Sequence, residues 1–494
     1  MSIEDANRWA EHNIAVTLET ANRIGIGGAS VLEAASSLTC SSAYSGTGGG
    51  ENAARALSLA LKHFVQIQDV SSKPLNEWAC EMNQECQFEL RMLQDPPNCL
   101  FGDICNCLNP KAASLLTKNA HRMNCEDLAR VFNARDVVID RMYCHIHKQM
   151  CPIKQASIHT AGTECVAWSP QGAKGGTAGK RALPWYTWCA QRRLIQEDYI
   201  LHENVPEFPL SLLQAELSNF YVISMDNSVI IDSSEHGQPY SRARRLTWMI
   251  HKRMMIEDIM SPLSNHLSFN QFEMMCRREC CIDWTSYFRA SPDDLQTELE
   301  WSQNRPTAKS INQAWRQDLE KSDFDASLTD NELKFLVKYR TICPNGVAML
   351  GQNPDKHPQH NAGKSQLQTI IRKAELYYIM QHNRWLTANE LLLVHNYPIE
   401  TQFAHFGFQC SFNFSRNAFS FPNRRRNALK NQVGNGMSLC TMSVAYAWIW
   451  IQHGRRLQAR GPKQPVDGMI RAAKRLRAQA SLGSQSSGDM SQRD

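Results

Sequence analysis

The chain has no run of about 18 apolar residues, the length that a helix needs to cross a bilayer. Its N-terminus, from Met1 to Asn13, lacks the positively charged head and apolar stretch of a secretory signal peptide. A strong charge of one sign is also missing, because 53 basic and 48 acidic residues leave a formal net charge of +5. We therefore expect neither a membrane protein nor a secreted one, and the net charge selects no class of partner.

Cysteine is plentiful, with 17 residues, but the paired Cys-x-x-Cys spacing of a zinc ribbon is missing. An odd number of cysteines cannot all pair within one chain, so we expect reduced thiols, in the nucleus of a eukaryote or otherwise in the cytoplasm. The stretch from Cys144 to Cys151 includes His145 and His147, which makes four possible ligands within eight residues. Because structural zinc sites usually draw on two separate turns, we expect a helix or loop there and assign no metal site.

The length and the pattern of apolar residues predict an α/β protein. The 494 residues correspond to about three domains, or to one large domain with an insertion. The first half alternates short apolar runs with helical patterns, such as one face formed by Ala53, Leu57 and Leu61. This alternation predicts a Rossmann-like sheet with helices on both faces, plus a smaller inserted region. The expected strands are 36–44, 77–82, 99–103, 157–162 and 199–205.

Changes in this rhythm divide the chain into segments. From Trp248 the sequence becomes polar and rich in loops, and its clearest helical pattern is 366–380. Between Arg455 and Arg477, many basic residues face the single acid Asp467 before a Ser- and Gly-rich end, which predicts a disordered tail. The expected segments are an N-terminal helical extension (1–35), a main α/β domain (36–247), a smaller inserted region (248–383), a return to the main domain (384–453) and the basic tail (454–494).

A Gly-rich turn and two acids predict a site for an adenosine-bearing ligand. The turn 44–50 follows the first expected strand and opens a helix, so its backbone N–H groups can approach an anion or carboxylate. Glu81 ends the second strand, where a carboxylate can accept both hydroxyls of a ribose. Asp103 follows the third, where an acid can accept from an adenine amino group. The alternative for each acid taken singly is to cap a helix or to form a surface ion pair; together, at neighbouring strand ends, they favour the ligand.

The ends of the fourth and fifth strands predict a reactive centre. Cys165 follows the fourth strand and Glu203 ends the fifth, so a thiol and a carboxyl would lie side by side. Arg242 and Arg244 are two residues apart in an extended segment and share one face. A thiol, a carboxyl and a guanidinium suit attack on an electron-poor ring held by its carbonyl and ring nitrogen. The alternative for Cys165 is a buried, inert thiol.

In their order along the chain, these segments resemble the motifs of the cytosine carbon-5 DNA methyltransferases. Single motifs of this kind are weak, whereas six or more in the right order along most of the chain are strong. The matching segments are the cofactor loop 44–49 with Tyr in place of Phe, Glu81-Met82, Gly102-Asp103-Ile104, Cys165 with Trp168 and Ser169, Glu203-Asn204-Val205, the arginine motif 239–244, Arg384-Trp385-Leu386-Thr387 with Glu390, and 432–437.

The resemblance implies transfer of a methyl group from S-adenosylmethionine to carbon 5 of a cytosine flipped out of double-stranded DNA. Cys165 would bond to carbon 6, and Glu203 would protonate or hydrogen-bond ring nitrogen 3. Asn204 would hold the loop geometry. Arg242 would bind the base carbonyl, and Arg244 would support Glu203 or the thiolate. The residues implied to bind the cofactor are Tyr44, Gly46, Gly48, Gly49, Glu81, Met82, Asp103, Ile104 and Asn435.

The resemblance also gives the segments roles. Residues 36–247 would be the catalytic and cofactor-binding domain, 248–383 the target-recognition region, and 384–453 would carry the final motifs. The Gly-rich loop 170–185 suits closure over nucleic acid, and the basic run 424–432 suits phosphate contacts.

Three departures from the family's pattern keep alternatives open. The Pro before the nucleophile is Glu164, the Gln after it is Val166, and the Gln of the arginine motif is Tyr240. An acid beside Cys165 would raise the pKa of the thiol. One alternative is an RNA cytosine-5 methyltransferase, although the Pro-Pro-Cys segment expected there is absent. The other is a catalytically weak, nucleic-acid-binding regulatory homologue.

Overall fold

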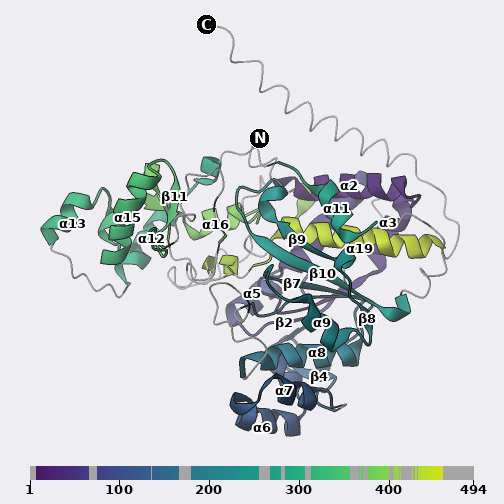
Figure 1. Cartoon of the computed structure of the whole chain (residues 1–494). Coiled ribbons are helices and arrows are strands. Elements are labelled where there is room, and N and C mark those ends of the chain that lie inside the picture. The colour runs from purple at the N-terminus through teal and green to yellow at the C-terminus, as the bar shows by residue number, and fades with distance from the viewer. Residues whose placement is uncertain are drawn as a thin grey trace, which may run out of the picture.

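The computed structural model arranges the chain in a larger body and a smaller lobe (Figure 1). The larger body holds a ten-stranded sheet and the smaller lobe a three-stranded one. Among the described residues, no helix combines the length and the apolar character that crossing a membrane requires. The described residues are 7–65, 75–134, 136–165, 168, 180–254, 267–279, 284–305, 313–356, 367, 369–370, 376–399, 405–410, 412, 426, 429–430, 432–434 and 436–459.

The main sheet has the strand order β5-β4-β3-β2-β1-β6-β7-β10-β8, and β9 also pairs with β10. Its five central strands, from β3 to β7 in this order, are parallel, so their carboxyl ends meet at one edge. The chain builds outward from β1 in both directions, and ligands of such sheets bind at this switch point. The bounds are β1 Thr39–Ala43, β2 Leu75–Cys80, β3 Cys99–Phe101, β4 Arg141–Cys144, β5 Gln149–Pro152, β6 Ile158–Gly162, β7 Tyr199–Asn204, β8 Tyr221–Val222, β9 Ser228–Asp232 and β10 Ala243–His251.

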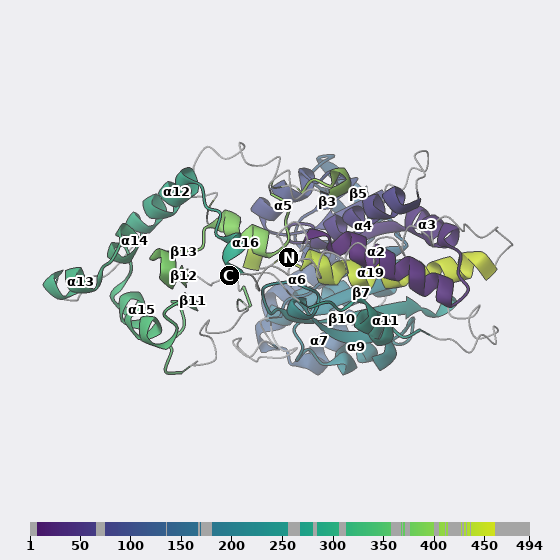
Figure 2. The same cartoon turned by 90° about the horizontal axis from the view of Figure 1, so that it is seen from above.

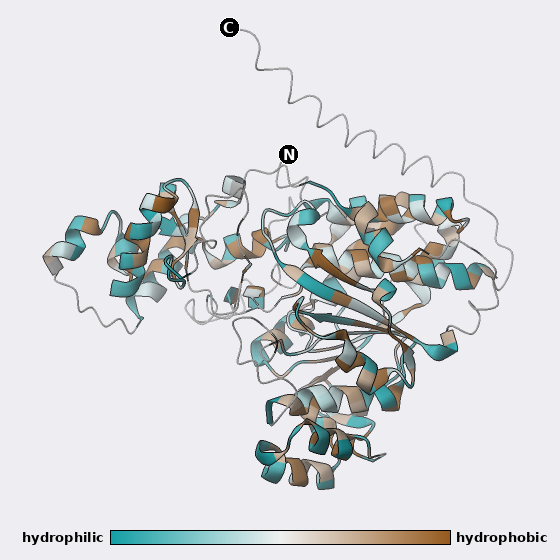
Figure 3. Cartoon of the chain, viewed as in Figure 1, coloured by the Kyte–Doolittle hydropathy of each residue, from teal (hydrophilic) through white to brown (hydrophobic). Residues whose placement is uncertain are grey.

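Helices cover both faces of this sheet, which confirms the predicted α/β fold (Figure 1). Hydrophobic and hydrophilic residues alternate along many of these helices, as expected when one face is buried (Figure 3). The predicted face of α4 (Gly49–Val65), with Ala53, Leu57 and Leu61, is fully buried. The layer that includes α4 also holds α2 (Trp9–Arg23), α3 (Gly28–Ser37), α11 (Phe269–Cys276) and α19 (Leu439–Ala459), and the opposite layer holds α7 (Cys125–Phe132), α8 (Leu183–Ile195) and α9 (Leu210–Leu217).

Three expectations about elements differ from the structure. The first strand begins at Thr39 and not at 36, because the preceding residues finish α3. The expected helix 366–380 is wrong at its end, where Tyr377–Ile379 forms β12. Tyr and Ile favour strands, and antiparallel pairing with β11 (Val347–Met349) decides the outcome. The boundary expected at Trp248 falls inside β10, and α11 packs on α19, so the larger body continues beyond it.

Two further segments were predicted differently from what the structure shows. The stretch from Cys144 to Cys151, expected as a helix or loop, belongs to a β-hairpin, because β4 and β5 pair on either side of a short turn. The helix α19 runs to Ala459, so residues 454–459 belong to this helix and not to the tail. The rest of the tail, 460–494, lies outside the described residues.

The smaller lobe has a core of its own, and Figure 2 shows it set apart from the main sheet. Its sheet orders β11, β12 and β13 (Arg384–Trp385). The helix α16 (Ala388–Val394) lies between the lobe and the larger body. The other helices of the lobe are α12 (Pro292–Gln303), α13 (Gln313–Leu319), α14 (Asp323–Ala326) and α15 (Asp330–Ile342).

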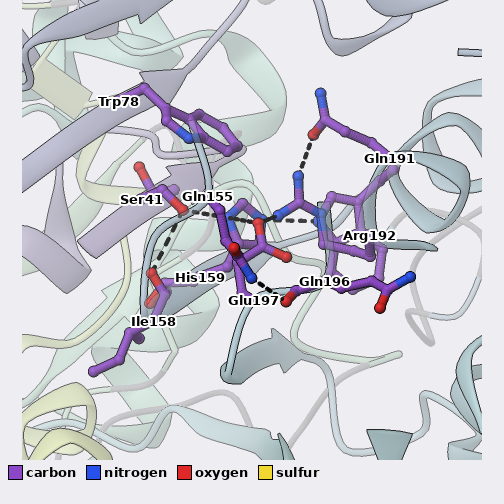
Figure 4. A network of polar contacts seen from close by, with 12 residues as sticks. Ser41, Trp78, Gln155, Ile158, His159, Gln191, Arg192, Gln196 and Glu197 are labelled. Carbon is purple, nitrogen blue, oxygen red and sulfur yellow. Dashed lines mark hydrogen bonds and ion pairs between the residues drawn. The ribbon is translucent and has the colours of Figure 1, made fainter. Parts of the chain in front are cut away.

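A buried polar network ties the centre of the main sheet to α8 (Figure 4). Arg192 and Glu197, both fully buried, form an ion pair. On β6, His159 Nδ1 lies 2.9 Å from Ser41 Oγ, and Nε2 accepts a 3.0 Å hydrogen bond from Trp188 Nε1 on α8. Burial, with the Arg192 charge, lowers the pKa of His159 well below its ordinary value, so the imidazole is neutral. The network therefore fixes β1 and β6, the strands that lead to the candidate site.

Candidate active site

The end of β6 turns out of the sheet beside the end of β7, since Gly162 pairs with Glu203. Thr163 Oγ1 lies 2.7 Å from His202 Nε2. The Asn204 amide donates to Thr163 Oγ1 at 3.0 Å and to its carbonyl at 3.2 Å. Burial lowers the pKa of His202 to about 3, so this side chain is also neutral. These contacts fix the turn that leads to the cysteine.

The carboxylate of Glu203 and the guanidinium of Arg244 form an ion pair over this turn. Arg244 Nε lies 3.1 Å from Glu203 Oε1, and the two side chains are only 17% and 12% exposed. A Cβ added to Gly162 would lie 3.1 Å from Glu203 Oε2, so the carboxylate sits directly over the glycine. The missing side chain at Gly162 therefore makes room for the carboxyl group.

The thiol of Cys165 is partly buried and lies within the electrostatic reach of this pair. Burial raises its pKa, the charge of Glu203 raises it further, and the charges of Arg244 and Arg242 lower it; the net direction is upward. The group is therefore a neutral thiol at neutral pH. It becomes a nucleophile only when its proton is removed.

Arg242 contacts the backbone of two later segments of the chain. It is buried, and its guanidinium donates to the carbonyls of Ile370 at 2.7 Å and Gly436 at 2.9 Å. Burial, with the charge of Arg244, lowers its pKa to about 10, which still leaves it charged at neutral pH. Because both terminal nitrogens donate to backbone carbonyls, the side chain braces the final motif against the sheet.

At the ends of β2 and β3, the two predicted cofactor acids follow paired strands. Glu81 Oε2 accepts from the Gly46 N–H at 2.9 Å, and Oε1 accepts from the Asn83 N–H at 2.8 Å. Asp103 accepts from the Cys105 N–H at 2.9 Å and caps a short 3-10 helix. Glu81 thus shapes the Gly-rich turn through its contact with Gly46.

The Gly-rich turn needs unusual backbone angles. Tyr44, Gly46 and Gly48 have φ values of 53°, 55° and 76°, which glycine adopts freely and tyrosine rarely. Gly49 packs on Met437, where an added Cβ would lie 2.9 Å from the methionine Cβ. Among the described residues, Tyr44 is one whose hydroxyl is buried without a hydrogen-bond partner. A buried polar atom left open at this loop fits a site that a further group completes.

The remaining predicted cofactor residues differ in exposure. Met82 is 67% exposed beside Glu81, and Ile104 is buried. Asn435 and Val166 lie outside the described residues, and so does the stretch 169–179, which includes most of the loop expected to close over nucleic acid.

Glu164 and Tyr240, two of the residues that depart from the family's motifs, differ in exposure. The side chain of Glu164 is exposed. Tyr240 is fully buried and stacks on His395, with ring centroids 4.8 Å apart. Tyr240 is therefore a core residue of the arginine motif.

Charged side chains in the later segments of the chain form ion pairs inside the protein. Arg384 donates to both oxygens of Glu390 at 2.8 Å, and Thr387 caps α16 reciprocally with the same glutamate. In the basic run 424–432, Arg426 and Lys430 are buried against a glutamate of α12. The phosphate contacts expected of this run therefore do not include these two side chains, because they are already paired inside the protein.

Sequence reasoning missed two residues of the site, Thr163 and His202. Thr163 precedes Cys165 by two positions, and His202 precedes Glu203 by one. Neither belongs to the motifs that carried the resemblance, and their contact forms only when β6 and β7 lie side by side.

No family model matches the chain, and no curated protein matches it. Solved methyltransferase structures are similar to it. A protein assigned as a DNA modification methyltransferase, encoded within an E. coli prophage, is 14% identical at a TM-score of 0.39, with 86% of this chain and 100% of that chain covered. The S. pombe Dnmt2 methyltransferase is 13% identical at 0.36, with 83% and 98% covered. The Entamoeba histolytica methyltransferase EhMeth is 12% identical at 0.38, with 83% and 97% covered.

Proposed function

We propose that the protein is a DNA (cytosine-5-)-methyltransferase, which transfers a methyl group from S-adenosylmethionine to carbon 5 of a flipped-out cytosine. The observation that carries the proposal is the convergence of Cys165, Glu203 and Arg244 at the carboxyl ends of β6 and β7. A thiol, a carboxyl and a guanidinium at this edge suit addition to an electron-poor ring. The order of the motifs along the chain supports cytosine as that ring.

In this proposal the reaction begins when the Cys165 thiol gives its proton to the Glu203 carboxylate. The thiolate forms a bond to carbon 6 of the cytosine, while Glu203 donates a proton to ring nitrogen 3 and so stabilises the developing charge. The electron pair then reaches carbon 5, which takes the methyl group. The carbon 5 proton then passes to water, and the proton on ring nitrogen 3 returns to Glu203. The bond between carbon 6 and sulfur breaks with its electron pair on sulfur, which restores the aromatic ring and the free enzyme.

Neighbouring residues position these groups. Arg244 orients the Glu203 carboxyl through their 3.1 Å contact. Asn204 and His202 hold Thr163, and with it the turn that carries the nucleophile. Arg242 acts through backbone carbonyls, so we give it a positioning role in place of direct contact with the base.

The cofactor proposal rests on the edge formed by β1, β2 and β3. Glu81 would bind the ribose hydroxyls and Asp103 the adenine amino group, beside the turn 44–49. The exposed side chain of Met82 would cover the adenine. When bound, S-adenosylmethionine supplies the methyl group.

The nucleic-acid proposal requires a base outside the helical stack, since a thiol cannot reach ring carbon 6 within a duplex. The exposed side chains of Lys180 and Arg181 lie at the start of the described chain after 169–179 and suit phosphate contacts. Their positive charge supports a polyanionic substrate.

Covalent capture tests the proposal. The full chain is incubated with S-adenosylmethionine and a pool of duplexes that carry 5-fluorocytosine, whose fluorine blocks the final elimination. We expect a denaturation-stable adduct with the wild-type chain and none with Cys165→Ser. As a matched control, Cys125→Ser changes an exposed cysteine outside the site and should leave the adduct intact.

Two other outcomes would contradict the proposal. An adduct with fluorinated RNA, and none with any DNA, would assign the substrate as RNA. Cofactor binding without an adduct on either nucleic acid would indicate a regulatory homologue.

A further inference from the structure

Four side chains with metal-binding atoms meet near the β5 end of the main sheet. Cys99 begins β3, Cys144 ends β4, His147 lies in the turn of the β4–β5 hairpin, and Cys151 lies on β5. Their three sulfurs and one ring nitrogen all lie within 4.8 Å of one another. The hairpin supplies three donors and an earlier strand the fourth, so the ligands come from two separate segments, as in structural zinc sites.

The distances match those around a tetrahedral ion. His147 Nδ1 lies 3.6 Å from Cys99 Sγ, 3.4 Å from Cys144 Sγ and 3.5 Å from Cys151 Sγ. Zinc bonds of about 2.3 Å to sulfur and about 2.0 Å to nitrogen, at tetrahedral angles, separate such ligand atoms by roughly 3.6 Å. The nitrogen is therefore nearly equidistant from three sulfurs, at the spacing that one shared ion requires.

The backbone of the hairpin turn also suits a thiolate ligand. The His147 N–H points to Cys144 Sγ at 3.5 Å, so the Cys-x-x-His turn directs its own donor to the sulfur. The His145 N–H donates to the Leu100 carbonyl at 2.7 Å, which holds the turn against β3. Such contacts orient metal ligands before the metal binds.

The buried face of the hairpin strands is small. It consists of Met142, Cys144 and Cys151, so two of these three side chains belong to the cluster, while the other strand residues are exposed. Within the described chain, the register with β3 is the single pair Phe101 and Cys144. A two-stranded hairpin at a sheet edge gains stability from a cross-link to the strand beside it.

We infer that Cys99, Cys144, His147 and Cys151 form a structural zinc site, with three thiolates and one imidazole around a tetrahedral Zn²⁺. The three thiols release their protons on binding, and His147 binds through Nδ1. All four positions are filled by protein ligands, which assigns the ion a structural and not a catalytic role.

The site would brace the loop that carries Asp103. A Cβ on Gly102 would lie 3.0 Å from His145 Nε2, so the hairpin turn rests directly on the Gly102-Asp103 segment. A metal that fixes this turn therefore stabilises the end of β3 from outside the proposed active site.

Metal analysis tests the inference without any assay of methyl transfer. The full chain is purified without chelators, and its zinc content is measured by mass spectrometry. We expect roughly one Zn²⁺ per chain, removal of which by a strong chelator lowers the melting temperature. Replacement by Co²⁺ should give the visible absorption of a tetrahedral cobalt–thiolate site, a readout on the wild-type chain that requires no variant.

Matched variants locate the ion. Cys99→Ser and His147→Ala should lose it, whereas Cys125→Ser and His145→Ala should keep it, because neither residue belongs to the cluster. Wild-type protein without stoichiometric metal and without the cobalt spectrum would overturn the inference. A disulfide among the three cysteines in place of the ion, or equal zinc content in all four variants, would overturn it as well.

Discussion

The ionisation of Cys165 depends on charged neighbours of both signs. Burial and Glu203 raise its pKa, while Arg244 and Arg242 lower it. Glu203→Gln removes the charge that disfavours the thiolate. At a given pH below the thiol pKa, we therefore expect faster alkylation of Cys165 by iodoacetamide, measured by peptide mass spectrometry. Methyl transfer should fall by roughly 10²- to 10⁴-fold, because the proton donor to the base is lost.

The same substitution shifts the pH profile. Since the pKa of Cys165 is raised in the wild-type chain, its alkylation should increase with pH through a range above the ordinary thiol value. In Glu203→Gln this rise should move to lower pH. Glu207→Gln, which changes an exposed carboxylate in the following turn, serves as the control and should leave the profile unchanged. If the alkylation of Cys165 had the same pH dependence in the wild-type chain, Glu203→Gln and Glu207→Gln, this would contradict the interaction between Glu203 and Cys165.

Gly162 is the second residue on which the geometry depends. An added Cβ would lie 2.6 Å from Met437 Cε and 3.1 Å from Glu203 Oε2, so Gly162→Ala must displace both side chains. The methionine can yield at its flexible end, but the carboxylate moves away from its catalytic position. A shift of about 1 Å in a catalytic group costs roughly 10²-fold in rate, so we expect this smaller shift to lower kcat by about 10-fold.

The control for Gly162→Ala is the same substitution at a glycine that has free space around it. The Cβ of Gly351→Ala would have no atom within 4 Å, so kcat should stay at the wild-type value. Steady-state kinetics on the two variants compare them directly. Equal activity would show that Glu203 does not need the space above Gly162.

Several site residues could be predicted because chemistry and strand position coincide in them. Cys165 and Glu203 follow apolar runs that became β6 and β7, whose pairing brings them together. The position of Arg242 could not be predicted, since its acceptors at Ile370 and Gly436 are 128 and 194 residues away in sequence. The spacing of Arg242 and Arg244 predicted that they share one face of an extended segment, but it carried no information on which residues that face contacts.

At the scale of elements, the helices α3 and α19 approach each other closely, so a substitution at their contact tests how they pack. Gly454 in α19 faces α3 so closely that an added Cβ would lie 2.9 Å from the Ser30 carbonyl oxygen. Because the obstacle is backbone, Gly454→Ala must push the helices apart, and we expect a loss of about 1–3 kcal/mol in unfolding free energy. Urea unfolding measures this loss.

The control for this packing lies at the same pair of helices. Gly27 precedes α3, and its added Cβ would lie 3.9 Å from Gln458 Oε1, which is ordinary contact distance. Gly27→Ala therefore creates no clash and should cost less than Gly454→Ala. If Gly454→Ala were as stable as the wild-type chain, the close approach of α19 to α3 would be refuted.

The β4–β5 hairpin shows why some elements escaped prediction. Its strands have four residues each, and the intervening turn 145–148 contains two histidines, so the segment gave no periodic signal. The hairpin is defined by pairing within itself and by its contact with β3. Cys99, which belongs to β3, reaches the same cluster only through that arrangement.

At the scale of the whole molecule, Glu298 joins the smaller lobe to the rest of the chain. This buried side chain of α12 accepts from Trp385 Nε1 at 2.7 Å, from the Ala388 N–H at 3.1 Å and from Arg426 Nε at 2.9 Å. The pKa of Glu298 is lowered: burial alone would raise it, but the charges of Lys430 and Arg426 outweigh burial. Its carboxylate is therefore charged, and it holds together segments that lie far apart in sequence.

Glu298→Gln keeps the shape of this side chain and removes its charge. The substitution breaks the buried ion pair between this side chain and Arg426, and we expect a loss of about 3–5 kcal/mol in unfolding free energy. Because the folded pKa of Glu298 lies below the unfolded one, the wild-type contribution is fully present at neutral pH and disappears as pH falls through the folded value. Wild type and variant should thus differ in melting temperature at pH 7 and converge in acid.

Glu300 offers a control on the same helix, because its side chain is exposed. Glu300→Gln removes an equal charge without breaking a buried ion pair, so its melting temperature should follow that of the wild-type chain at every pH. A Glu298→Gln curve that followed this control at pH 7 would remove Glu298 from the joint between lobe and body. A difference that persisted unchanged in acid would show that the loss comes from packing and not from the carboxylate charge.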